Sequence, residues 1–174
     1  MKIDPSGEHE HRVGGLAFDS LVDQHWEPVY RLAYHLCGRN VHDAQDLAQE
    51  TFLKAIANRG SFRPGTNLKA WLLRIASNAF LDQRRRRKTA KATPLEAEPA
   101  VNAADAAEGD ERMRLIGSAI QQLDDVQRTV FMLRTQEDLS FREIAGMLDT
   151  TEETARWHML QARRRLMKML EGKL

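Results

Sequence analysis

Four side chains in the N-terminal third of the sequence are of types that could bind a metal ion. They are His25, His35, Cys37 and His42. His35 and Cys37 are two residues apart, and on a helix such residues point in different directions, because neighbours on one face are three or four apart. A closed metal site needs about four converging ligands. The spacing therefore favours structural roles, leaves a small metalloenzyme as a remote alternative, and predicts no metal and no cofactor.

Basic side chains gather in two places where an anion could bind. Residues 84–88 are all Arg or Lys, and the range 67–91 holds eight basic residues against the single acid Asp82, while a second basic group lies at 156–168. A block of like charge this dense repels itself and is stabilised by an anionic partner. A nucleic acid is favoured over a membrane, because a membrane-bound helix would turn to lipid the apolar face that a core needs here. The sequence has no Gly-rich phosphate loop and no paired carboxylates typical of a catalytic pocket, so we do not expect this chain to be an enzyme.

A pair of helices with a short turn is predicted near the C-terminus, over about residues 140–168. Ser140 and Glu143 have the spacing of a capping box, which predicts a helix start near Ser140. A polar cluster then interrupts the apolar periodicity, and a second helix is expected to be capped by Thr150 or Thr151. The apolar side of that helix contains Ala155, Met159, Ala162, Leu166 and Met169. This order is that of a helix-turn-helix, whose second helix can enter the major groove, although a plain helical hairpin fits the same residues.

Three helices are predicted in the N-terminal half, from apolar residues repeated every three or four positions. The first covers 17–36, the second runs from about 41 to 58, and the third begins after a cap at Thr66 or Asn67 and ends at about 87. The second helix is expected to turn inward Ala44, Leu47, Ala48, Thr51, Phe52 and Ala55, and its outer face contains Asp43, Asp46, Gln49, Glu50 and Lys54. Simple solvation would explain this acidic face as well as a partner would. The apolar face of the third helix is expected to consist of Leu68, Trp71, Leu72, Ile75, Ala76, Ala79 and Phe80. Another side, expected to be exposed, carries Arg74, Asn78, Asp82 and Arg85.

Length and composition place the chain among all-α proteins with two small helical domains. Its 174 residues carry 26 Lys and Arg against 25 Asp and Glu, and the apolar periodicity is helical. We expect a mobile tail at 1–15, a helical domain at 16–88, a flexible acidic linker at 89–110 and a second helical domain at 111–174. The single Cys37 predicts a reducing compartment, the cytoplasm, and the absence of a membrane-length apolar run predicts no membrane insertion.

Three segments, taken in order, resemble bacterial RNA polymerase sigma factors of the extracytoplasmic-function (ECF) type. They are DAQDLAQETFLKA at 43–55, AWLLRIASNAFLDQRRRR at 70–87 and LSFREIAGMLDTTEETARWHMLQARRRL at 139–166. The first two resemble sigma region 2 and the third resembles region 4. Together they cover nearly the whole chain in the order of the family. Nothing between them resembles region 3, which points to the minimal ECF architecture.

The resemblance implies three binding surfaces. The acidic helix face would dock on the β′ clamp helices of core polymerase, through Asp43, Asp46, Gln49 and Glu50. The loop at 61–67 and the third helix would hold unstacked bases and phosphates of the promoter −10 element, through Ser61, Phe62, Arg63, Asn67, Asn78, Asp82, Arg84 and Arg85. The last helix would read the −35 element in the major groove, through Arg156, Trp157, His158, Leu160, Gln161, Arg163 and Arg164.

The same resemblance implies the function and the partners. The chain would bind core RNA polymerase at the β′ clamp helices and the β flap, direct it to a set of promoters and help to open them, under the control of an anti-sigma factor. Trp157 stands where the family usually has a small or hydroxyl residue, and His158 and Gln161 stand where basic residues are usual, so no −35 sequence is inferred. The alternative is a stand-alone helix-turn-helix regulator, which leaves the acidic helix and Asn78 without a task.

Overall fold

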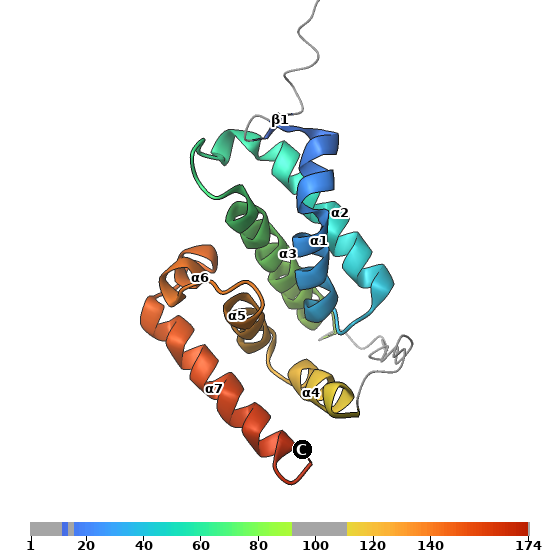
Figure 1. Cartoon of the computed structure of the whole chain (residues 1–174), viewed down its shortest axis with the longest axis vertical. Coiled ribbons are helices and arrows are strands. Elements are labelled where there is room, and N and C mark those ends of the chain that lie inside the picture. Colours follow the sequence, from blue (N-terminus) through green and yellow to red (C-terminus); the bar gives the residue numbers. More distant parts are fainter. Residues whose placement is uncertain (1–11, 14–15, 92–110, 174) are drawn as a thin grey trace, which may run out of the picture.

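The computed structural model describes residues 12–13, 16–91 and 111–173, and this part of the chain is almost entirely helical (Figure 1). Its elements are β1 (Arg12–Val13), β2 (Leu16–Ala17), α1 (Phe18–Leu36), α2 (Val41–Ala57), the 3₁₀ turn η2 (Arg59–Ser61), α3 (Leu68–Lys91), α4 (Glu111–Gln121), α5 (Asp125–Thr135), α6 (Phe141–Met147) and α7 (Glu152–Leu170). The predicted all-α class is confirmed. None of the described helices is both long and apolar enough to cross a membrane.

The first described residues differ from the expectation of a mobile tail over 1–15. β1 pairs with β2 in antiparallel register, with Arg12 opposite Ala17 and Val13 opposite Leu16. This short pair leads directly into α1, which begins at Phe18. The rest of the predicted tail, residues 1–11 and 14–15, lies outside the described part of the chain.

Helices α1, α2 and α3 pack against one another in the N-terminal half, which we define as residues 16–91 (Figure 1). Asn40 caps α2, since its Oδ1 accepts a hydrogen bond from the Asp43 amide at 3.1 Å. The buried face of α2 is the one that the periodicity predicts, with Ala44, Leu47, Ala48, Thr51, Phe52 and Ala55. The acidic residues of α2 consequently lie outside this core.

Helix α3 is longer than its apolar pattern predicts. Asn67 caps it, since its Oδ1 accepts a hydrogen bond from the Ala70 amide at 3.1 Å. The helix then continues to Lys91, because Arg, Lys and Ala are good helix formers and no Gly or Pro interrupts them. Residues 89–91 are therefore helical, not part of a linker. The remaining segment of the predicted linker, 92–110, lies outside the described residues.

Helices α6 and α7 form the predicted pair with a short turn in the C-terminal half, which we define as residues 111–173. Ser140 Oγ accepts a hydrogen bond from the Glu143 amide at 3.2 Å, and Glu143 Oε2 accepts one from the Ser140 amide at 2.8 Å. The capping box is thus confirmed. Thr151 caps α7, with its Oγ1 accepting from the Thr154 amide at 3.1 Å. Between the helices Asp149 has a φ of 52°, a left-handed conformation that Asp tolerates better than most residues.

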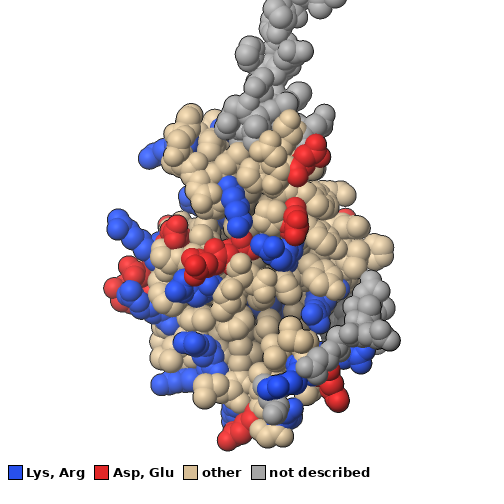
Figure 2. Space-filling view, in the orientation of Figure 1, with Lys and Arg blue, Asp and Glu red and all other residues tan. Residues whose placement is uncertain are grey.

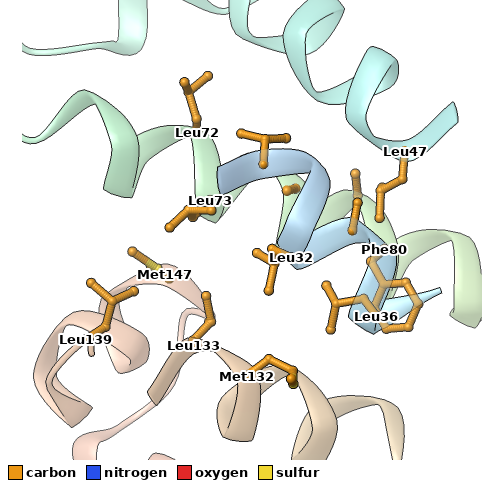
Figure 3. Packing of buried hydrophobic residues seen from close by; sticks show 14 of the residues in the cluster. Leu32, Leu36, Leu47, Leu72, Leu73, Phe80, Met132, Leu133, Leu139 and Met147 are labelled. Atoms are coloured by element: carbon orange, nitrogen blue, oxygen red, sulfur yellow. The ribbon is translucent and has the colours of Figure 1, made fainter. Parts of the chain in front are cut away.

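The two halves of the chain share one hydrophobic core. Leu36 of α1 and Leu73 of α3 belong to the same buried cluster as Leu133 of α5 and Met147 of α6 (Figure 3). Leu73 and Ser77 are 1% and 0% exposed, on a side of α3 for which the N-terminal periodicity alone predicted no burial. They are buried because α5 and α6 pack there. Helices α1 and α3 therefore lie between α2 and the C-terminal half (Figure 1).

Candidate polymerase and nucleic-acid interfaces

The outer face of α2 is the candidate polymerase surface. Asp46 and Gln49 are exposed and Asp43 is half-buried. Leu53, on the same side two turns after Asp46, is 66% exposed. Sequence reasoning gave Leu53 no role, although the seven-residue spacing from Asp46 could have drawn attention to it. An apolar side chain with charged neighbours is typical of a protein-binding surface, whose apolar centre is buried and whose rim is polar.

Glu50 takes part in contacts within the N-terminal half. Its Oε2 accepts a hydrogen bond from Gln83 Nε2 of α3 at 2.5 Å, and its Oε1 lies 2.7 Å from Lys54 Nζ. Burial acts to raise the pKa of the Glu50 carboxyl, but the hydrogen bonds from Lys54 and Gln83 and the nearby positive charges outweigh burial and hold that pKa below its ordinary value. Glu50 is therefore ionised and already paired. A partner at this face meets Asp43, Asp46 and Gln49 more readily.

The loop between α2 and α3 is the first candidate surface for the −10 element. Ser61, Arg63 and Asn67 are exposed on it. Phe62 is half-buried, and its ring packs edge-on against Trp71, with the ring centroids 5.3 Å apart. This placement differs from the expected role of Phe62 as a base contact, because its ring fixes the loop to α3. The loop thus presents polar side chains that can reach the edges and phosphates of a single strand.

Asp82 and Arg85 lie on the solvent side of α3 and form an ion pair across one helical turn. The Arg85 side chain is 79% exposed and that of Asp82 is 42% exposed. A nucleic-acid phosphate could compete with Asp82 for the Arg85 guanidinium, because charge-assisted hydrogen bonds to phosphate are strong. Both residues are accessible to a DNA strand in this conformation.

Asn78 and Arg84, the other two predicted −10 residues of α3, face the C-terminal half. Asn78 Nδ2 donates a hydrogen bond of 3.1 Å to the carbonyl oxygen of Met147, at the end of α6. Arg84 Nε donates one of 3.0 Å to Oδ1 of Asp125, at the start of α5. The expectation that Asn78 is exposed is therefore wrong for this conformation, because Asn78 is half-buried against the end of α6, whereas Arg74 and Asp82, one turn before and after it, remain accessible.

The outward face of α7 is the candidate surface for duplex DNA. Trp157 and Leu160 are 53% and 46% exposed, although both are large and apolar. Arg163 and Arg164 are exposed further along the helix. Basic side chains line the edge of the molecule where α7 lies (Figure 2). Apolar side chains beside arginines suit a major groove, in which thymine methyl groups and phosphates are both within reach.

Arg156 is oriented by two neighbours on the helix-turn-helix. Its Nη2 donates a hydrogen bond of 2.5 Å to Glu152 Oε1, one turn earlier on α7. Its guanidinium carbon lies 5.5 Å from the centroid of the Phe141 ring, and the guanidinium of Arg134 lies at the same distance from that ring. A planar guanidinium held in this way loses less side-chain entropy when it forms a bidentate contact with a base. The contacts to Glu152 and Phe141 are not evident from the sequence motif.

His158 and Gln161 are less accessible than the sequence suggested, since both are half-buried. The Nδ1 atom of His158 is buried and has no hydrogen-bond partner among the described residues. Burial lowers the pKa of His158, although the charge of Asp124 opposes this effect. The imidazole is therefore mainly neutral at neutral pH, a state that does not favour a contact between His158 and a DNA phosphate.

The residues considered as metal ligands do not converge on one point. No group of three or more His, Cys, Asp or Glu within residues 12–13, 16–91 and 111–173 could hold a metal ion. Burial, with a smaller contribution from Asp43, raises the pKa of the Cys37 thiol to about 12 against the effect of nearby arginines. Burial also lowers the pKa of His35, and Arg39 and Arg31 add to this effect. A protonated thiol is a poor ligand, because metals bind the thiolate.

Family models match the two halves separately. Residues 21–90 match Sigma-70 region 2, and residues 113–166 match Sigma-70, region 4. The first range contains the acidic face of α2 and the −10 candidates, and the second contains the helix-turn-helix. A protein with both regions is a sigma-type factor.

Proteins of similar sequence show which kind of sigma factor this is. The ECF RNA polymerase sigma factor SigW of Bacillus subtilis is 33% identical over 169 residues, which cover 88% of this chain and 89% of SigW. The RNA polymerase sigma factor CarQ of Myxococcus xanthus is 34% identical, with 89% and 88% covered. The ECF sigma factor SigE of Mycolicibacterium smegmatis is 37% identical over 86% of this chain, which spans only 60% of SigE. The chain belongs to the ECF family of RNA polymerase sigma factors.

Solved structures share the fold. The sigma factor RpoE of Bartonella quintana, in a complex with the anti-sigma factor NepR, superposes with a TM-score of 0.71 at 26% identity, over 90% of this chain and 98% of that chain. CnrH, in a complex with the cytosolic domain of CnrY, gives a TM-score of 0.65 at 24% identity, over 97% and 93%. The arrangement of helices is therefore one that other chains of this fold adopt.

Proposed function

We propose that the protein binds core RNA polymerase and directs it to a particular set of promoters, where it recognises the −10 and −35 elements and helps to open the duplex. The observation that carries this proposal is the presence in one chain of an exposed acidic helix face on α2 and a basic helix-turn-helix in α6 and α7. A polymerase-dependent initiation factor needs both surfaces. A stand-alone regulator needs only the second.

In this proposal α2 docks on the coiled-coil clamp helices of the polymerase β′ subunit. The carboxylates of Asp43 and Asp46 steer the encounter, and Gln49 and Glu50 contribute polar contacts. Leu53 supplies apolar area that a partner helix would bury, because it is 66% exposed and lies on the same side of α2. The C-terminal half contacts the β flap. In this proposal the regions expected as domains at 16–88 and 111–174 act as two separate binding units.

The two DNA elements are assigned to different surfaces. The loop residues Ser61, Arg63 and Asn67, together with Asn78 of α3, take unstacked bases of the −10 element, whose edges are accessible only in a single strand. Asp82, one turn after Asn78 on α3, belongs to the same proposed surface, and Arg84 and Arg85 hold the DNA backbone. The −35 element binds in duplex form, where Arg156 and the exposed Trp157 and Leu160 reach base edges and Arg163 and Arg164 hold phosphates.

An anti-sigma factor is proposed as the regulator of this chain. The support is that two similar structures, RpoE and CnrH, were each solved in a complex, RpoE with the anti-sigma factor NepR and CnrH with the cytosolic domain of CnrY. The compartment that goes with such a role is the cytoplasm, where polymerase acts. In this role the chain carries no catalytic centre of its own, and the RNA chemistry belongs to the polymerase.

In vitro transcription with purified core polymerase over a genomic DNA library tests the proposal most directly. We expect transcripts that start at a defined set of sites only when the protein is present, and an alignment of these sites yields both promoter elements. A titration against core polymerase separates the alternative. Binding to duplex DNA without any association with core polymerase would establish a stand-alone regulator and exclude the sigma function.

A further inference from the structure

Glu137, which follows α5, is the first of two acidic side chains of the C-terminal half that are buried against the N-terminal half. Its side chain is 1% exposed. Arg31 Nη2 of α1 donates a hydrogen bond of 3.0 Å to Glu137 Oε1, and Lys69 Nζ of α3 lies 2.7 Å from Oε2 in an ion pair. A carboxylate removed from water is tolerated only when it is paired. Both partners of Glu137 come from the other half.

Asp125, the first residue of α5, is the second such side chain and is 8% exposed. Arg84 Nε lies 3.0 Å from its Oδ1 and Lys88 Nζ lies 2.8 Å from its Oδ2, so α3 supplies both close cations. Burial acts to raise the pKa of Asp125, but the contact with Lys88 and the charges of Arg84, Lys88 and Arg128 outweigh burial and lower the pKa. Asp125 is therefore ionised within the interface.

Hydrogen bonds to backbone carbonyl groups add to the same interface at the end of α1. The last turn of a helix leaves carbonyl oxygens without partners. Arg128 Nη1 of α5 donates a hydrogen bond of 2.7 Å to the Leu36 carbonyl, and Gln121 Nε2 of α4 donates one of 3.0 Å to the His35 carbonyl. Side chains of the C-terminal half thus satisfy carbonyl groups at the end of α1 in the N-terminal half. We call this packing of the C-terminal half against α1 and α3 the closed arrangement. It is specific, because hydrogen bonds and ion pairs accompany the shared apolar core.

The closed arrangement occupies two of the proposed −10 contacts and leaves the proposed polymerase surface open. The side-chain amide of Asn78 donates its hydrogen bond to the Met147 carbonyl, and Arg84 is paired with Asp125. Asp46 of α2 is exposed, and α2 lies on the side of α1 and α3 away from α5 and α6 (Figure 1). Polymerase could therefore dock on a closed molecule, whereas a −10 strand could not engage Asn78 or Arg84.

We propose that Glu137 and Asp125 form an electrostatic latch, which holds the free protein closed and keeps Asn78 and Arg84 from nucleic acid until the two halves separate. Asp125 pairs with Arg84, which is proposed to hold a DNA phosphate, so its carboxylate acts as an internal substitute for phosphate, and Glu137 adds a second ion-paired contact between the two halves. The consequence for −10 recognition rests on the proposed function. Docking of polymerase on α2 then precedes engagement of the −10 strand.

The test uses the full chain without polymerase. The double variant Asp125→Asn/Glu137→Gln removes both charges and keeps the size of the side chains. Small-angle X-ray scattering at low salt gives the radius of gyration, and fluorescence anisotropy gives the affinity for a labelled single-stranded DNA of mixed sequence. We expect a larger radius of gyration than for the wild type and an affinity for single strands that is higher by about fivefold or more, because four cations become available.

The matched control is the double variant Asp138→Asn/Asp149→Asn. It has the same change of net charge in the same half, but both residues are exposed, and Asp138 pairs only with Arg134 of its own half among the described interactions. We expect wild-type compactness and wild-type affinity for single strands. Equal gains in affinity for both double variants would mean that net charge, not the latch, controls binding.

A second variant approaches the latch from the other half. Arg31→Gln/Lys69→Gln replaces side chains that are 40% and 41% exposed, so the cores are left intact, and it leaves Glu137 without a partner in the closed form. We expect expansion in scattering, with the helix content unchanged in circular dichroism. If Asp125→Asn/Glu137→Gln loses helix content, the scattering of Arg31→Gln/Lys69→Gln decides whether the latch exists. Compact profiles for both variants would overturn the latch, as would expansion of the first without a gain in single-strand affinity.

Binding to core polymerase is measured in parallel, so that the two ideas can fail separately. A chain that opens when the carboxylates are removed but never binds core polymerase would retain the latch and overturn the proposed function. A chain that binds core polymerase and initiates transcription, yet stays closed in both variants, would overturn the latch alone.

Discussion

Arg128 Nη1 donates a hydrogen bond of 2.7 Å to the carbonyl oxygen of Leu36, and this bond joins α5 to the end of α1. Arg128 is 6% exposed and also donates to the carbonyl groups of Gln121 and Leu123. Truncation would leave these buried acceptors without their donor. We expect Arg128→Ala to lower the free energy of unfolding by roughly 2–4 kcal/mol. Urea unfolding followed by circular dichroism measures the change.

Arg165→Ala is the control for this variant, because Arg165 is exposed on α7. Substitutions at such positions change the free energy of unfolding by about 0.5 kcal/mol or less. If Arg128→Ala were as mild as Arg165→Ala, the bonds at the end of α1 would not contribute to the stability of the closed arrangement.

Acid should destabilise the protein in two steps. Burial and two nearby arginines lower the pKa of His35, so the unfolded chain binds this proton more readily, and stability falls as the pH drops below the ordinary histidine pKa of about 6.5. Despite burial, its cationic partners lower the pKa of Asp125, so its contribution is present above the ordinary Asp pKa of about 3.9 and is lost as the pH falls further. Urea unfolding at about pH 7.5, 5.5 and 3.5 should show both losses.

The Asp125→Asn variant isolates the second step. It should remove part of the loss of stability between about pH 5.5 and 3.5 and leave the histidine step unchanged. An identical low-pH loss in this variant would show that carboxylates other than Asp125 cause it, for example Glu50, whose pKa is also lowered.

Cys37 should react slowly with thiol reagents. Its pKa of about 12 means that very little thiolate exists at neutral pH, whereas an exposed cysteine titrates near 8.5. We expect the native protein to react with a disulfide reagent slower than the urea-unfolded chain by about 10³-fold at pH 7.5. A native rate close to that of the unfolded chain would mean that the thiol is accessible and ionised. Such a result would also make Cys37 available as a metal ligand.

Local patterns in the sequence were sufficient for the helices and for most of their faces. The apolar repeat of α2 identified all six of its buried residues, and the Ser140–Glu143 spacing identified the start of α6. These features depend on residues within one or two turns of each other, so a single sequence contains them. The end of α3 was missed because the basic run after 87 carries no apolar periodicity, although its residues favour a helix.

Contacts between the two halves could not be predicted in the same way. Nothing near Glu137 in the sequence identifies Arg31 or Lys69, which are 106 and 68 positions away, as partners. The burial of Ser77 likewise depends on α5 and α6, and Asn78 bonds to a carbonyl group 69 positions away in the sequence. Asn78 was consequently expected to be exposed. Which side of α3 is covered is a property of tertiary packing, not of local spacing.

Asn78→Ala should reduce promoter opening and leave the binding of core polymerase unchanged. Loss of a hydrogen bond to an unstacked base is expected to lower the amount of open complex by about fivefold or more. Permanganate footprinting of unpaired thymines measures it. The variant also loses the bond to the Met147 carbonyl, which would loosen the closed form and act in the opposite direction. A reduced amount of open complex therefore cannot be attributed to the latch.

Arg74→Ala is the matched control on α3, because Arg74 is exposed and has no assigned role. It should form open complex at the wild-type level. Normal opening by Asn78→Ala would remove Asn78 from the −10 surface and leave the loop residues Ser61, Arg63 and Asn67 as its proposed base contacts.

Arg156→Ala tests how α7 reads duplex DNA. A bidentate contact to a base should be worth about 1–3 kcal/mol at the specific −35 site, with little loss on unrelated duplexes. A phosphate contact would instead weaken binding to every duplex and reduce the slope of log affinity against log salt by about one. Glu152→Gln is the informative companion, because Glu152 holds the Arg156 guanidinium through a 2.5 Å bond. If orientation matters, Glu152→Gln weakens the specific site more than unrelated duplexes, although it removes a negative charge that should favour both.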